Sequence, residues 1–256
     1  MFFMRNKIFF LAAFVLILTI AFFPKAKTEP NYSYKIYTPQ NFSEVTRSVQ
    51  RASKDSQILF IVDFSNSMNE EIMGKSKLEM ARTTLAEILP KISPDVKLGL
   101  RIYGHRAGFT YLQGCQASKL FVPLGLGNYQ TIMTSLYSNN ATGWTPITYS
   151  LKQAVNSDFI GSTGKKHIIL LTDGGENCDE SPCTYVINLM KTRDDVVIDV
   201  IAFDIKDIEA NNQLRCTALT TSGKFLSAQN EEDLSNSLFE SVGINKDVRA
   251  NVKIGE

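Results

Sequence analysis

The sequence is poor in histidine and tryptophan and has no excess of charge of either sign. Its 256 residues include two histidines and one tryptophan, and 27 basic residues stand against 26 acidic ones. Proteins that bind nucleic acids usually carry a basic face or tail, so we expect no nucleic-acid partner. The G-x-S-x-G and H-E-x-x-H motifs of serine hydrolases and zinc proteases are also missing. We therefore expect a protein that is not an enzyme.

Length and composition indicate a globular chain. Apolar residues make up 44% of the sequence and charged residues 21%. The length allows one sizeable core and one or at most two domains, and we expect one.

The N-terminus has the layout of a secretory signal. Arg5 and Lys7 precede an uncharged apolar run, Ile8 to Phe23, which Pro24 and Lys25 close. Residues 1–27 are therefore expected to be a signal peptide or an uncleaved signal anchor in the inner membrane. Residues 28–56 are expected to be a linker, with a short helix packed on the domain at residues 42–49. The protein would be exported, whether periplasmic, membrane-anchored or secreted.

The four cysteines all follow the export signal. An even number of cysteines in an oxidising compartment favours two disulfides. A zinc site is the alternative. Four cysteines allow three pairings, and the sequence does not choose among them. The candidates are Cys115, Cys178, Cys183 and Cys216.

Apolar runs of strand length alternate with helical patterns along the rest of the chain. This alternation predicts an α/β fold with a doubly wound, mostly parallel six-stranded sheet and helices on both faces. The expected strands are 58–62, 96–103, 119–122, 167–172, 196–203 and one near Phe225. The expected helices are 77–89, 128–137, 146–155, 184–190, 208–219 and 231–242, and residues 104–114 are expected to form a polar loop.

Oxygen-bearing side chains follow two of these strands. Asp63, Ser65 and Ser67 come directly after the first strand, Asp173 ends another, and Thr145 lies on a loop that enters a helix. A parallel sheet brings the carboxyl ends of its strands to one edge, where ligands bind. Carboxylates and hydroxyls suit Mg²⁺, with Mn²⁺ or Ca²⁺ as alternatives. The competing interpretation is that these residues are ordinary turn formers and helix caps.

Such a site leaves room for an outside ligand. Mg²⁺ takes six oxygens in near-octahedral geometry and keeps several waters. A protein partner offering an Asp or Glu would complete both the coordination and the charge balance. The alternative function is a metal-dependent hydrolase, but both histidines are poorly placed to be a general base.

Three separated motifs carry a resemblance to a known family. The sequences DFSNS, GWTPI and LLTDGGENC resemble the von Willebrand factor type A domain with its metal-ion-dependent adhesion site. The resemblance implies that Asp63, Ser65, Ser67, Thr145 and Asp173 hold a divalent ion, some directly and some through water. It also implies a non-catalytic protein-binding domain, for adhesion or complex assembly, over residues 57–243, followed by a tail at 244–256.

Further details of the resemblance concern one edge strand and one branch of the family. The family's short antiparallel strand would be Lys119 to Val122. The segments RIYGH, PLG, TDGGENC and LRC look like the exported bacterial branch labelled Ca-activated chloride channel-like, a label of ancestry and not of a pore. Assembly with a cytosolic ATPase, as in chelatase-like relatives, conflicts with the export signal.

Two further features near these motifs have open interpretations. Trp144, beside Thr145, would either contact a partner or pack its own loop. Glu176 and Asp179 would either tune the field of the site or form a solvated acidic loop.

Overall fold

The computed structural model describes residues 56–178 and 180–244. The expected signal segment, the linker with its short helix at residues 42–49, and the tail from residue 245 lie outside the described residues. None of the helices in the described ranges is long and apolar enough to cross a membrane.

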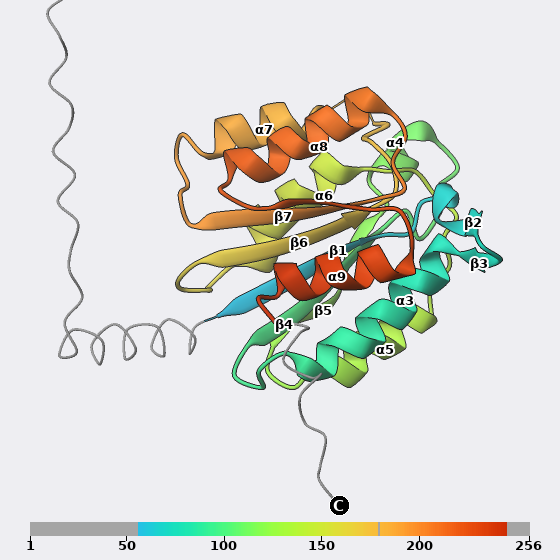
Figure 1. The fold of residues 1–256 in the computed structure, drawn as a ribbon. Coiled ribbons are helices and arrows are strands. Elements are labelled where there is room, and N and C mark those ends of the chain that lie inside the picture. The colour runs from blue at the N-terminus through green and yellow to red at the C-terminus, as the bar shows by residue number, and fades with distance from the viewer. Residues whose placement is uncertain (1–55, 179, 245–256) are drawn as a thin grey trace, which may run out of the picture. The chain divides into compact units, whose positions relative to one another are not determined.

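Six strands form one sheet in the order β5-β4-β1-β6-β7-β8 (Figure 1). Neighbouring strands are parallel except for β5, which pairs antiparallel with β4 at the edge. The prediction of a doubly wound, mostly parallel sheet is therefore confirmed, as is the antiparallel edge strand. The strands are β1 (Gln57–Asp63), β4 (Lys97–Tyr103), β5 (Ser118–Gly125), β6 (Lys166–Thr172), β7 (Val196–Phe203) and β8 (Phe225–Ala228).

Helices cover both faces of the sheet (Figure 1). One face is covered by α3 (Lys77–Ile88), α5 (Tyr129–Tyr137) and α9 (Glu231–Ser241). The other is covered by α6 (Ile147–Gln153), which continues as one π-helical turn, η3 (Ala154–Asp158), and by α7 (Pro182–Leu189) and α8 (Ile208–Thr220).

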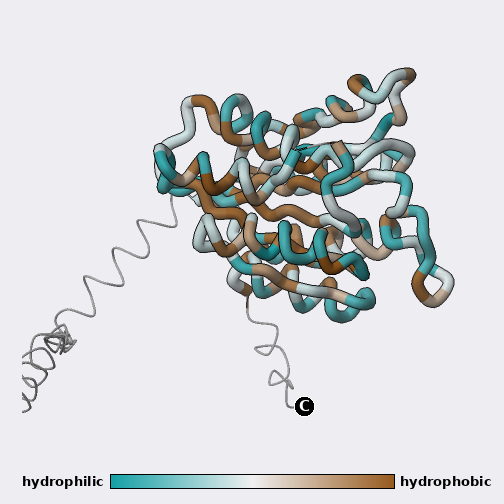
Figure 2. The backbone as a smooth tube through the Cα atoms, turned by 90° about the horizontal axis from the view of Figure 1, so that it is seen from above, coloured by the Kyte–Doolittle hydropathy of each residue, from teal (hydrophilic) through white to brown (hydrophobic). Residues whose placement is uncertain are grey.

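The burial of the central strand β1 explains the continuous apolar run in its sequence. All seven of its residues are buried. Phe60 and Val62 join the core cluster under α3 and α9, whereas Leu59 and Ile61 join the cluster under α6 and α8. The interior positions of β1, Ile58 to Val62, are buried on both faces of the sheet and are all apolar, whereas the buried residues at its two ends, Gln57 and Asp63, are polar. Figure 2 shows the resulting hydrophobic strands in the interior, between helices with hydrophilic outer faces.

Several short elements differ from the sequence-based expectation. A hairpin, β2 (Glu71–Ile72) and β3 (Lys75–Ser76), precedes α3, and two 3₁₀ turns, η1 (Asn66–Asn69) and η2 (Leu89–Lys91), flank that region. The expected polar loop at 104–114 contains α4 (Tyr111–Cys115), because the Thr110 hydroxyl accepts a hydrogen bond from the Gln113 N–H and caps it. Strand β5 continues past Pro123, which an edge strand tolerates.

The four cysteines form two disulfides, as expected. Cys115 of α4 pairs with Cys178 in the loop after β6, and Cys183 of α7 pairs with Cys216 of α8. The structure thereby chooses one of the three pairings. The alternative of a cysteine zinc site is wrong, since no cysteine is free.

Candidate metal centre

Asp63 ends β1 with its carboxylate entirely buried. Its Oδ1 accepts a hydrogen bond from the Ser65 N–H at 2.6 Å, and its Oδ2 accepts one from the Thr172 hydroxyl at 2.9 Å. Thr172 is the last residue of the neighbouring strand β6, and the motifs in the sequence did not point to it. These two donors fix the orientation of the carboxylate.

Ser65, Ser67 and Asp173 continue from Asp63 as one hydrogen-bonded chain. The Ser65 and Ser67 hydroxyl oxygens lie 3.1 Å apart, and the Ser67 hydroxyl donates to Asp173 Oδ1 at 2.8 Å. Asp173 is buried and follows β6 directly. Since β1 and β6 are parallel neighbours, their carboxyl ends bring these four predicted residues together.

Thr145 reaches the same edge through the backbone of the residues before it. Gly143 pairs with Ser65 in a parallel bridge, and its carbonyl accepts from the Asn66 N–H at 3.0 Å. Only glycine fits at position 143, because a Cβ there would lie 2.3 Å from the Arg106 carbonyl oxygen. Thr145 itself is buried, and its N–H donates to Asn177 Oδ1 at 2.8 Å. The threonine is therefore held next to the serine loop by backbone contacts.

A lysine that the sequence analysis missed lies at the centre of the acidic groups. The Lys77 ammonium donates to Asp173 Oδ2 at 3.1 Å and to Glu70 Oε2 at 2.7 Å, and it lies 3.7 Å from Asp204 Oδ2. Its side chain is 4% exposed. The sequence held one sign that Lys77 has a special role. Lys77 is the first residue of α3, and a cation is unfavourable at a helix N-terminus.

Asp63 and Asp173 lie close enough for their negative charges to repel each other. Burial raises the pKa of Asp63 to about 7, and the nearby charge of Asp173 adds to this against the hydrogen bonds from Ser65 and Thr172. Burial also raises the pKa of Asp173, although Lys77 opposes the shift. A divalent cation between the two carboxylates would favour their charged forms.

The donor chemistry of the site fits such a cation. Two carboxylates and three hydroxyls are hard oxygen ligands of the kind that Mg²⁺, Mn²⁺ and Ca²⁺ take. Within the described part of the chain, no three histidine, cysteine, aspartate or glutamate side chains form a group that could hold a metal. A cation held here would therefore depend on hydroxyl oxygens and water as well as on Asp63 and Asp173.

Glu176 is engaged in holding its own loop. Its Oε2 accepts from the Thr148 N–H at 2.7 Å, and its Oε1 accepts from the Cys178 N–H at 2.9 Å. Glu176 thus links the segment after Asp173 to the start of α6. Asp179 lies outside the described residues.

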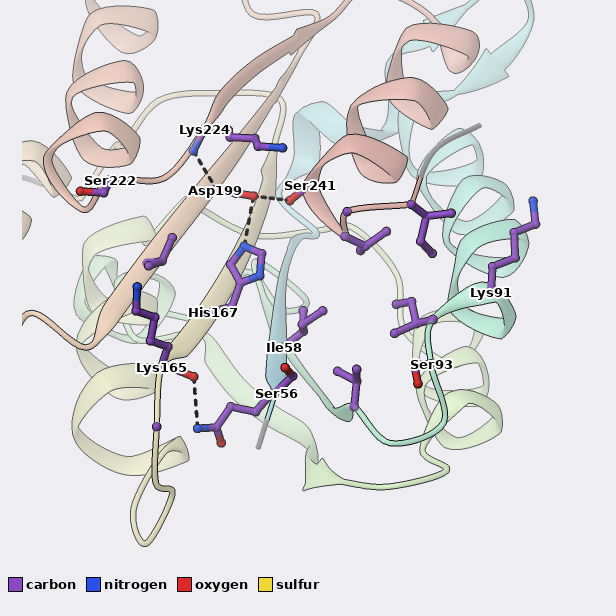
Figure 3. Close-up of a pocket in the computed structure, with 18 residues that line it drawn as sticks. Ser56, Ile58, Lys91, Ser93, Lys165, His167, Asp199, Ser222, Lys224 and Ser241 are labelled. Carbon is purple, nitrogen blue, oxygen red and sulfur yellow. Dashed lines mark hydrogen bonds and ion pairs between the residues drawn. The ribbon is translucent and has the colours of Figure 1, made fainter. Parts of the chain in front are cut away.

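A separate cavity of about 1040 Å³ lies at the opposite edge of the sheet, where the parallel strands begin (Figure 3). His167 Nε2 lies 3.1 Å from Asp199 Oδ2, without a well-aligned hydrogen bond. The Ser241 hydroxyl donates to the same oxygen at 2.7 Å. Because this serine is bonded to the aspartate and not to the histidine, the three side chains do not form a nucleophile with its base.

Comparison with known proteins identifies the family. The model of the von Willebrand factor type A (VWA) domain matches residues 57–240. The chain belongs to the VWA domain family. VWA domains typically act as protein-interaction modules.

Among curated proteins, the chain is similar to the uncharacterized protein YwmD of Bacillus subtilis (strain 168). The two are 29% identical over 189 residues, which is 70% of this chain and 81% of YwmD.

Among solved structures, the chain is similar to proximal thread matrix protein 1 of the mussel byssus. That structure is described as having a zinc-occupied MIDAS (metal-ion-dependent adhesion site) motif. Identity is 19% and the TM-score 0.56, over 78% of this chain and 51% of that one. It is also similar to the pilus adhesin SpaC of Lactobacillus rhamnosus GG, with 15% identity and a TM-score of 0.59, over 73% of this chain and 30% of SpaC. The chain thus spans about half or less of those structures, and at these identities the likeness concerns the fold.

Proposed function

We propose that this chain is a non-catalytic protein-binding module that works outside the cytoplasm and depends on a divalent cation. Asp63, Ser65, Ser67, Thr145 and Asp173 are the proposed cation ligands, with Mg²⁺ as the proposed ion and Mn²⁺ or Ca²⁺ as alternatives. A carboxylate from a partner protein completes the coordination.

The observation that carries the proposal is the hydrogen-bonded chain from Asp63 through the two serines to Asp173. It places two buried carboxylates and two hydroxyls within direct reach of one another at the ligand-binding edge of the sheet. Carboxylates and uncharged hydroxyls are hard oxygen ligands, and a set of this kind leaves some coordination positions of the cation open. The zinc-occupied MIDAS motif described for the mussel protein supports a cation at this edge.

The proposed location outside the cytoplasm draws support from three observations. The described residues hold two disulfides, which are typical of oxidising compartments. A pilus adhesin shares the fold. Residues 1–27 have the sequence of a signal peptide or inner-membrane anchor. We propose that residues 28–56 are a linker from this segment to the domain at 57–243, with a tail at 244–256.

Nothing in the part of the chain that the structure describes favours the alternative of a metal-dependent hydrolase. His105 packs edge-on against Phe121 at 5.3 Å between ring centroids. Burial, together with the nearby charges of Arg106 and Lys119, lowers the pKa of His105 to about 4. We assign this histidine to loop packing rather than to general-base catalysis.

A thermal-shift titration with Mg²⁺ and Mn²⁺ tests the proposal. Ligand at about 100 times its Kd adds about 2.7 kcal/mol of stability, which raises the Tm of a domain of this size by about 5–10 °C. Asp63→Ala should abolish the shift, because it removes the carboxylate on which Ser65 and Thr172 converge.

Asp95→Ala is the matched control, since Asp95 is an exposed aspartate before β4, at the other edge of the sheet. It should leave the metal-induced shift unchanged. A wild-type melting curve that neither ion moves would overturn the metal claim. Turnover of a phosphatase or esterase substrate that Asp63→Ala abolishes would overturn the non-catalytic claim.

A further inference from the structure

Exposed apolar side chains gather beside the candidate metal centre. Phe109, Tyr111 and Leu112 come from the loop that contains α4, and Trp144 directly precedes Thr145. Their exposed fractions are 103%, 45%, 64% and 39% in that order. Single exposed apolar residues are ordinary, but a group on adjoining loops marks an interaction surface. We name these four residues the apolar rim.

Two members of the apolar rim, Tyr111 and Trp144, are held in place by contacts within the protein. The Tyr111 and Trp144 rings pack edge-on with centroids 5.3 Å apart. Gly114 leaves room for the indole, since a Cβ at this position would lie 2.4 Å from Trp144 Cδ1. The Cys115–Cys178 disulfide ties the end of α4 to the loop after β6. A surface that is ordered before binding loses little entropy on binding.

The apolar rim is continuous with the proposed metal ligands. Trp144 and Thr145 are adjacent in the chain, and the Gly143 N–H donates to the Gly104 carbonyl at the base of the α4 loop at 2.7 Å. Gly143 in turn pairs with Ser65. Figure 1 shows α4 at the same edge of the sheet as hairpin β2–β3, which follows the serine loop.

A small cavity opens next to the apolar rim. It has a volume of about 190 Å³ and is lined by Tyr111, Leu112, Tyr149 and the Cys115–Cys178 disulfide, and Gln116, Lys152, Glu176 and Glu180 complete its wall. Small-molecule and cofactor sites are larger, about 300–1,000 Å³. A cavity of this size therefore suits a single side chain that projects from a polypeptide, and Tyr111, Leu112 and Tyr149 offer apolar contacts to it.

We propose that the apolar rim and this cavity bind a polypeptide in which the metal-binding Asp or Glu has large apolar residues as its neighbours in sequence. The inference rests on the proposed function, because the metal supplies the anchor for the acidic residue. Successive residues of an extended chain advance about 3.3 Å. The one or two residues on either side of the acidic residue are therefore the ones that reach a surface continuous with Thr145. Tyrosine and tryptophan are enriched among residues that dominate binding energy at such surfaces.

The protein carries its own reporter for a test, because Trp144 is the only tryptophan in the sequence. Tryptophan fluorescence of the full chain can be titrated in Mg²⁺ with three capped pentapeptides. The first has an aspartate flanked by leucine and phenylalanine, the second has the same aspartate flanked by serines, and the third is the first with asparagine in place of aspartate. We expect the first to bind at least tenfold more tightly than the other two.

The double variant Phe109→Ser with Leu112→Ser should reduce this preference to less than threefold. Both side chains are exposed, so their replacement should leave the fold intact. Ile160→Ser is the matched control, because Ile160 is 77% exposed and lies before β6, at the opposite edge of the sheet. It should leave the preference unchanged.

The outcomes separate this inference from the proposed function. If Mg²⁺ binds by calorimetry but the apolar-flanked peptide shows no advantage, or no binding, the inference fails while the metal site stands. An advantage that survives in the double variant also overturns it. If Mg²⁺ itself fails to bind, the proposed function fails, and with it the inference. Equal binding of the apolar-flanked peptide in EDTA would show that the apolar rim acts without the metal and would overturn the proposed pairing.

Discussion

The Lys77 ammonium lies 3.1 Å from Asp173 Oδ2, so a buried cation of the protein's own neutralises one of the proposed metal ligands. Glu70 and Asp204 also face this ammonium, at 2.7 and 3.7 Å. Lys77 therefore balances a group of carboxylates that would otherwise repel one another. It also holds Asp173 Oδ2, which leaves Oδ1 to Ser67.

Replacing Lys77 by methionine should strengthen divalent-cation binding. Loss of the ammonium leaves the carboxylates unbalanced, so the metal-free protein should melt at a lower temperature and the Kd for Mg²⁺ should fall about tenfold or more. Calorimetry and thermal melting in EDTA measure the two effects. Lys75→Met is the control, because Lys75 pairs with Glu231 away from Asp173. Weaker Mg²⁺ binding in Lys77→Met would contradict this account and mark the lysine as a support for ligand geometry.

Thr145→Val should weaken Mg²⁺ binding without destabilising the metal-free protein. The change keeps the side-chain volume and removes the hydroxyl oxygen, while the backbone N–H bond to Asn177 remains. We expect a Kd for Mg²⁺ at least tenfold higher, and Thr145→Ser should restore most of the affinity. An unchanged Kd in the valine variant would remove Thr145 from the ligand set.

Loss of either disulfide should reduce stability, but loss of only one of them should weaken peptide binding. Replacing either pair by serines should cost about 2–4 kcal/mol of stability, because each bridge closes a long loop in the unfolded chain. Loss of Cys115–Cys178 should also weaken binding of the apolar-flanked peptide, because this bridge holds α4 beside Trp144. Loss of Cys183–Cys216, between α7 and α8, should leave peptide binding unchanged. Urea unfolding and the fluorescence titration measure the two properties. Equal loss of peptide binding in both variants would contradict the distinction.

Protonation of Asp199 should lower the free energy of unfolding of the protein at acidic pH. Burial alone would raise the pKa of this carboxyl, but the interactions with His167, the Lys224 N–H and Ser241 outweigh it, and the pKa lies below its ordinary value. The stabilisation is then present above the unfolded-state pKa and is lost as the pH falls through the lower folded-state pKa.

Asp199→Asn should therefore cost about 1–3 kcal/mol at pH 7 and progressively less below about pH 4. Urea unfolding in EDTA across that range measures the difference. Asp194→Asn changes an exposed carboxylate on the same side of the sheet and should cost less than about 0.5 kcal/mol. A cost for Asp199→Asn that stays constant down to pH 2 would show that the charge of Asp199 plays no part.

The sequence by itself determined the strands, the main helices and the edge at which the proposed oxygen ligands meet. The interior positions of a strand buried on both faces, such as Ile58 to Val62 of β1, are apolar, and this local pattern is visible without a structure. A shared edge for Asp63, Ser65, Ser67 and Asp173 followed from parallel topology, since parallel strands end at the same edge, but the structure supplied the pairing of β1 with β6 that puts these residues in contact.

Only the tertiary structure decided the cysteine pairing, the place of Lys77 and the presence of the apolar rim. The cysteines of the two disulfides are separated by 63 and 33 positions in the sequence, and Lys77 and Asp173 are separated by 96. Such contacts depend on how helices and loops pack on the sheet, and composition and periodicity record only local preferences. The same holds for Trp144, whose neighbour Tyr111 lies on a short helix that the sequence presented as part of a polar loop.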